Sequence, residues 1–103
     1  MGPADEDSES QRPETVRRDD MPPVDFNILV LSLNTSALIQ LGEGPDDQGQ
    51  TSLNLPMARQ SIDMLSMLEE KTQGNLSGEE ERLLHQVLFD LRLRFARKAD
   101  SRP

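Results

Sequence analysis

The chain has 103 residues, a formal net charge of −8 and no cysteine, tryptophan or tyrosine. This length suits one small domain, and the missing cysteines exclude disulfides, thiolate metal sites and cysteine nucleophiles. The acidic balance argues against general nucleic-acid binding, because contacts with phosphates need a basic surface.

The N-terminal segment, residues 1–23, is acidic, contains prolines and has almost no apolar side chains. Because such a segment cannot offset its ordering entropy by burial, its composition predicts a disordered tail. A solubilising role and a docking role on a partner both fit this charge pattern. The first ten residues have no basic start and no apolar stretch, so we expect no signal peptide and a cytoplasmic protein.

The first helix is predicted over residues 25–41, with Asp25 as its N-cap and Gly42 as its stop. One apolar stripe at helical spacing should face the core; it consists of Phe26, Leu29, Val30, Leu33, Ala37 and Leu41. A second apolar stripe should lie on the far side; it consists of Ile28, Leu31, Leu38 and Ile39. The stretch is too short and too rich in polar residues to predict a membrane span.

A second helix is predicted over residues 55–73, after a loop rich in glycine, proline and aspartate. Asn54 can cap this helix, and Pro56 is tolerated in its first turn. The core side of the helix is apolar; it includes Leu55, Ala58, Ile62, Leu65 and Leu68, with Met57 and Met64 beside them. Asp46 and Asp47 in the loop lack the ligand spacing of a calcium site, so we expect them to form a turn.

The stretch KTQGNLSGEE, residues 71–80, is typical of a corner between two helices. Gly74 fits the left-handed position after a helix, and Ser77 with Glu80 forms a capping box for the next one. That third helix is predicted over residues 78–98, and residues 99–103 are predicted to be disordered. The short corner makes the last two helices an antiparallel hairpin, so the predicted fold is an all-α domain of three helices over residues 24–98.

Several short motifs occur together along the three predicted helices. They are Ser-Ala-Leu and Leu-Gly at the end of the first helix, Leu-Pro-x-Ala-Arg at the start of the second, Ile62-Asp63, the Glu-Glu-Lys-Thr-x-Gly-Asn-Leu corner and Asp90-Leu91-Arg92. In this combination the chain resembles a bacterial family of small proteins known as domain of unknown function 1844. The resemblance covers most of residues 26–95. It implies a small, mostly helical, non-secreted bacterial protein, and it implies no activity, substrate, cofactor or catalytic residue.

The residues themselves predict no catalytic, metal or cofactor site. His85 is the only histidine and has no cysteine or second histidine with which to share a metal. The acidic run Glu79–Glu81 is explained by its place in the first turn of a helix, where the helix dipole favours negative charge. We therefore expect a protein that is not an enzyme.

The main functional expectation comes from a surplus of apolar side chains. Besides the second stripe of the first helix, Phe89 and Leu93 lie opposite the core side of the third. A soluble monomer seldom exposes so much apolar surface, which favours a homo-oligomer, and a dimer first of all, or a further protein partner. The alternative is that the first helix lies in a groove between the other two, and that Phe89 and Leu93 pack under the loop.

Two other functions stay open at this stage. A basic cluster near the C-terminus, formed by Arg92, Arg94, Arg97 and Lys98, either complements the helix dipole or docks an acidic partner or RNA. The small aromatic content weakens the RNA or ribosome hypothesis. The third hypothesis is a small-ligand carrier or enzyme with a cavity among Met57, Met64, Met67 and the apolar stripes of the first helix, although methionine at helical spacing usually fills a core.

Overall fold

The computed structural model describes residues 23–101, which form three helices. These are α2 (Phe26–Gln40), α3 (Leu55–Lys71) and α4 (Gly78–Asp100). The predicted all-α fold with three helices is confirmed. The predicted tail lies outside the described residues except for its last position, Pro23. α3 ends two residues earlier than expected, and α4 continues through residues 99 and 100, which were predicted to be disordered.

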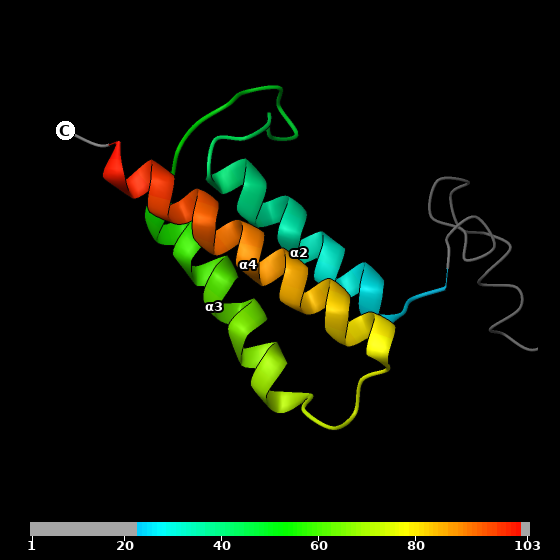
Figure 1. The fold of residues 1–103 in the computed structure, drawn as a ribbon. Helices are drawn as coiled ribbons and strands as arrows, with labels where there is room; N and C mark the ends of the chain where they lie inside the picture. The colour runs from blue at the N-terminus through cyan, green and yellow to red at the C-terminus, as the bar shows by residue number, and fades with distance from the viewer. Residues whose placement is uncertain (1–22, 102–103) are drawn as a thin grey trace, which may run out of the picture.

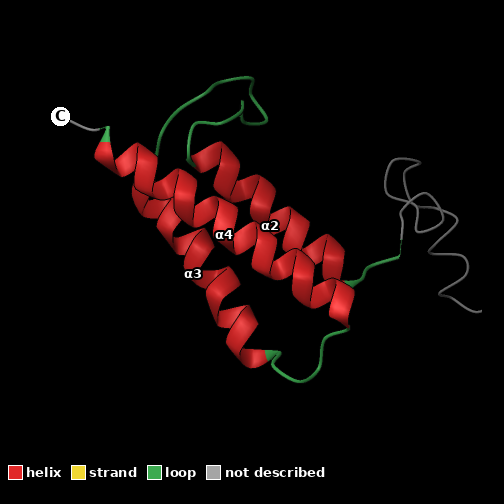
Figure 2. Ribbon diagram, in the orientation of Figure 1, coloured by secondary structure: helices red, strands yellow, loops and turns green. Residues whose placement is uncertain are grey.

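The three helices run up, down and up. α2 and α4 point in the same direction, and α3 runs antiparallel to both (Figure 1). Each helix contacts the other two; a long loop joins α2 to α3, and a short corner joins α3 to α4 (Figure 2). The predicted α3–α4 hairpin is therefore confirmed, and α2 lies against both of its helices.

The core lies where the three helices meet. The residues buried there are Val30, Ala37, Leu41, Leu55, Ala58, Ile62, Leu65, Leu84, Val87, Leu88 and Leu91. Two positions of α2 differ from the predicted stripes. Leu29 was expected in the core but its exposed fraction is 43%, whereas Leu38, expected on the far side, packs against the core. α2 is apolar around most of its circumference, so helical spacing alone could not decide which side is buried.

The ends of α2 are fixed by its own sequence. The Asp25 carboxylate accepts a hydrogen bond from the backbone N–H of Ile28 at 2.9 Å, as expected of an N-cap. At the other end, Gly42 has φ +75° and its N–H donates to the carbonyl of Ile39, while the N–H of Glu43 donates to the carbonyl of Leu38. This pair of bonds is a Schellman motif, which stops the helix and places Glu43 directly beyond it.

The loop between α2 and α3 folds back on itself. An isolated antiparallel bridge joins Leu41 to Leu53 and closes the loop at its base. At its tip, the Asp46 carboxylate accepts hydrogen bonds from the N–H groups of Gln48 and Gln50, both at 2.9 Å. Asp46 thus organises a turn, as the sequence predicted.

The corner before α4 has the predicted geometry. Gly74 has φ +82°. The Ser77 hydroxyl accepts a hydrogen bond from the N–H of Glu80 at 3.1 Å, and the Glu80 carboxylate accepts one from the N–H of Ser77 at 2.8 Å. These two bonds are a capping box, and they orient the N-terminal end of α4 against the end of α3.

Candidate interaction surface

Exposed apolar side chains lie on all three helices. The large ones within residues 23–101 are Val24, Leu29, Leu31, Leu53, Met57, Met64, Met67, Phe89 and Leu93. Single exposed apolar residues are common on soluble proteins and need no explanation. The informative case is a cluster, and Phe89 with Leu93 on α4 forms one.

Phe89 and Leu93 line a shallow groove between α3 and α4, which we call the α3–α4 groove. Its volume is about 440 Å³, and the residues that line it are Glu69, His85, Leu88, Phe89, Arg92, Leu93 and Ala96. The exposed fraction is 71% for Phe89 and 41% for Leu93. Phe89 therefore does not pack under the loop, and that part of the alternative packing expected from the sequence is wrong.

Polar contacts between the two helices hold the groove in shape. The Nε2 atom of His85 lies 3.0 Å from a carboxylate oxygen of Glu69. The Arg92 guanidinium donates a hydrogen bond to the Ser66 hydroxyl at 3.0 Å. Both contacts join α4 to α3, so side-chain interactions connect the two helices that line the groove.

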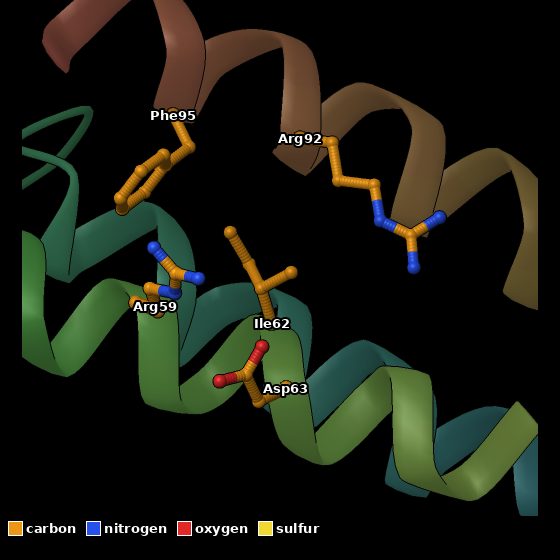
Figure 3. A pocket seen from close by; sticks show the side chains of 5 residues that line it. All are labelled: Arg59, Ile62, Asp63, Arg92 and Phe95. Carbon is orange, nitrogen blue, oxygen red and sulfur yellow. The ribbon is translucent and has the colours of Figure 1, made fainter.

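A second hollow adjoins the first, and Arg92 lines both. Its volume is about 220 Å³. Arg59, Ile62 and Asp63 reach it from α3, and Arg92 and Phe95 from α4 (Figure 3). The Phe95 ring and the Arg59 guanidinium approach each other across the gap between the helices (Figure 3). The hollow has charged side chains at its rim and one apolar side chain from each helix.

The second stripe of α2 forms no comparable surface. Leu31 is exposed, Ile28 and Ile39 are half-buried, and Leu38 packs against the core. The side chains of this stripe come from α2, whereas the groove is lined by α3 and α4. The six residues expected to form one interaction surface therefore lie in different places, and only Phe89 and Leu93 line the groove.

The four basic residues of the C-terminal cluster also have different surroundings. Arg92 turns toward α3, as described above. Arg94 and Lys98 turn toward the loop after α2, where their nitrogens lie 3.3 and 3.6 Å from the two carboxylate oxygens of Glu43. Arg97 is exposed. The four basic side chains therefore do not form one surface: Arg92 contacts Ser66, and Arg94 and Lys98 contact Glu43.

Arg94 is also tied to its own helix. Its Nε donates a hydrogen bond to the Asp90 carboxylate at 2.8 Å. This hydrogen bond raises the pKa of Arg94, the charge of Asp90 adds to the effect, partial burial opposes it, and Glu43 contributes a smaller increase. Arg94 is therefore a permanently charged link between α4 and the loop.

Sequence reasoning missed several residues of the surface, namely Arg59, Asp63, Ser66, Glu69 and Ala96. A signal for Ala96 existed, because it follows Phe89 and Leu93 at helical spacing. The partners on α3 depend on how the two helices align in the hairpin. Local patterns do not give that alignment.

Two absences hold within residues 23–101. No helix there is long and apolar enough to cross a membrane. The same part of the chain holds no group of three or more histidine, aspartate or glutamate side chains arranged to bind a metal ion.

The comparisons with known proteins give a family. No curated protein and no solved structure matches the chain. A family model described as domain of unknown function (DUF1844) matches residues 23–97, which include α2, α3, most of α4, both connections and the α3–α4 groove. The chain therefore belongs to the DUF1844 family.

Proposed function

We propose that the protein is a cytoplasmic, non-enzymatic interaction module that associates with itself through the α3–α4 groove. The observation that carries the proposal is the exposure of Phe89, which lines this groove with 71% of its surface exposed. A phenylalanine side chain in water forgoes roughly 1.5–3 kcal/mol of burial free energy. The neighbouring Leu93 and Ala96 extend the apolar area, so a partner that covers them gains more.

The polar residues around the groove also favour a protein partner. The lining of the groove combines apolar side chains of α4 with the polar side chains of His85, Glu69 and Arg92. Protein interfaces commonly have this organisation, with an aromatic anchor inside a polar rim. The groove is shallow, which suits a packed helix better than a small molecule.

The other two hypotheses have less support from the geometry. RNA binding by the basic cluster needs several cations on one surface, but Arg94 and Lys98 are already engaged by Glu43. A ligand cavity among the methionines needs enclosure, yet Met57, Met64 and Met67 are all exposed. We therefore place self-association first.

Sedimentation equilibrium of the full chain between 1 and 100 µM tests the proposal. We expect the wild-type chain to sediment as an assembly, with a dimer as the first species. The double variant Phe89→Glu/Leu93→Glu should sediment as a monomer, because two charges would have to be buried unpaired in the contact. A wild-type chain that stays monomeric at 100 µM would contradict the proposal.

Two control variants separate the groove from other apolar positions. Val24→Glu alters a side chain with an exposed fraction of 90%, and Leu31→Glu alters the exposed residue of the second α2 stripe. Both controls should leave the mass of the assembly unchanged. A Leu31→Glu chain that dissociates, together with a Phe89→Glu/Leu93→Glu chain that does not, would move the contact to α2. Circular dichroism of each variant checks that the helices are intact.

A further inference from the structure

The outer side of α4 carries a stripe that extends well beyond the groove. Six residues at alternating spacings of four and three form it, and we call them the α4 stripe: Arg82, Gln86, Phe89, Leu93, Ala96 and Asp100. All six are exposed. An average spacing of 3.5 residues is the period that lets two helices pack side by side along their whole length. At 1.5 Å per residue, the α4 stripe is about 27 Å long.

The α4 stripe is arranged symmetrically about one point. Its three pairs, Arg82 with Asp100, Gln86 with Ala96 and Phe89 with Leu93, are each centred on position 91. The outer pair has opposite charges, the middle pair has a polar and a small residue, and the inner pair is apolar. A helix with this pattern is complementary to a copy of itself that runs in the opposite direction.

The charges at the two ends select the direction. In an antiparallel pair, each Arg82 lies beside Asp100 of the second copy, which gives two attractive contacts. In a parallel pair, arginine would face arginine and aspartate would face aspartate, which gives two repulsive contacts. Within residues 23–101, neither Arg82 nor Asp100 takes part in an ion pair that would compete.

Antiparallel pairing also brings large and small side chains together at the centre. Phe89 of each copy lies over Leu93 of the other, so the most exposed apolar side chain of the helices meets an apolar partner twice. Arg92, at the side of the stripe, comes near its own copy at the two-fold axis. Its guanidinium is turned onto Ser66 of α3, which directs this charge away from the contact.

We infer that two copies of the chain pair through the exposed side of α4, antiparallel about a two-fold axis level with position 91, with Arg82 of each copy against Asp100 of the other. This inference rests on the proposed self-association and specifies its partner and geometry. A closed two-fold contact of this kind stops at the dimer, because each copy uses the same surface.

Cysteine cross-linking tests the direction, since the wild-type chain has no cysteine. Gln86→Cys chains and Ala96→Cys chains are oxidised separately and after mixing. In the antiparallel pair, residue 86 of one copy is level with residue 96 of the other, while equivalent residues are about 15 Å apart along the axis. We expect disulfide-linked dimers only in the mixture. Links within each separate preparation would show parallel pairing and overturn the inference.

Charge reversal gives a second readout. Arg82→Asp and Asp100→Arg should each weaken the dimer by about tenfold, since each turns two attractive contacts into repulsive ones. The combined variant Arg82→Asp/Asp100→Arg restores both contacts and should regain wild-type affinity. A single reversal without effect would overturn the pairing, as would a double variant that stays weak.

The experiments distinguish a wrong pairing geometry from a complete absence of self-association. A monomeric wild-type chain in sedimentation contradicts both. A dimer that forms no cross-link in any preparation, and whose affinity the charge reversals leave unchanged, keeps self-association through the groove but overturns the antiparallel pairing of the two α4 helices.

Discussion

Glu43 shows how one residue connects local and tertiary structure. The Schellman motif at the end of α2 fixes its backbone, and its carboxylate then lies between Arg94 and Lys98 of α4. The pKa of Arg94 is raised above its ordinary value, so the contribution of its charge to stability is fully present through the neutral range and is lost only as the pH rises through the raised pKa. The link to Arg94 should therefore not weaken from loss of that charge between pH 7 and 10.

Replacing Glu43 by glutamine should lower the free energy of unfolding by about 0.5–1 kcal/mol, because two partly exposed ion pairs are lost. The loss should shrink in 1 M salt, which screens such pairs. Urea unfolding at low and high salt measures both effects. Asp47→Asn is the matched control, since Asp47 is an exposed carboxylate of the same loop with no ion pair among residues 23–101. Equal losses in the two variants would show that only net charge matters.

The capping box is the feature that decides where α4 begins. Ser77 and Glu80 satisfy one another's backbone N–H groups, and the acidic first turn complements the helix dipole. Without the box, the first turn of α4 would fray. That end of the helix carries Arg82, so fraying would also loosen one end of the α4 stripe.

Ser77→Ala should cost about 1 kcal/mol of stability, whereas Ser77→Asp should cost much less because aspartate is also a good N-cap. Thermal unfolding followed by circular dichroism compares the two variants. Ser52→Ala serves as the control, because Ser52 is exposed and its hydroxyl makes no hydrogen bond within residues 23–101. If alanine and aspartate at position 77 were equally stable, the hydroxyl would have no capping role in solution.

At the level of the helices, the sequence predicted what depends on neighbouring residues and missed what depends on packing. The caps at Asp25, Asn54 and Ser77 are confirmed, because each acts within its own turn. The side of α2 that faces the core was partly wrong, since two apolar stripes offered equal burial and only contact with α3 and α4 chose between them. For example, the Ser61 hydroxyl bonds to the Gln40 side chain at 2.7 Å and helps to set this side.

The same division applies to the candidate surface. Phe89 and Leu93 could be recognised from their position opposite the core stripe of α4. The groove beside them could not, because Glu69 and Ser66 reach it only through the alignment of the hairpin. Arg92 contacts α3, whereas Arg94 and Lys98 contact Glu43 in the loop after α2. This difference depends on the path of that loop, which no local sequence pattern encodes.

For the whole molecule, stability depends both on its small size and on the apolar surface that it exposes. A helical body of this size has an expected stability of roughly 4–12 kcal/mol at 0.05–0.15 kcal/mol per residue. Part of its apolar content lies outside the core, on the exposed sides of α3 and α4. If a second copy covers the α4 stripe, the free energy of that contact adds to the stability of each chain. Folding and association should then be coupled in one transition.

This coupling predicts that stability depends on protein concentration. For a folded dimer in equilibrium with unfolded chains, raising the concentration from 2 to 200 µM stabilises the dimer by about 2.7 kcal/mol, the value of RT ln 100. With a denaturant dependence of roughly 2–3 kcal/mol per M for the two chains, the urea midpoint should rise by about 1 M. The midpoint of Phe89→Glu/Leu93→Glu should not change over the same range, because that chain unfolds as a monomer. A wild-type midpoint that is equally insensitive would mean that the exposed phenylalanine is stable in water without a second copy.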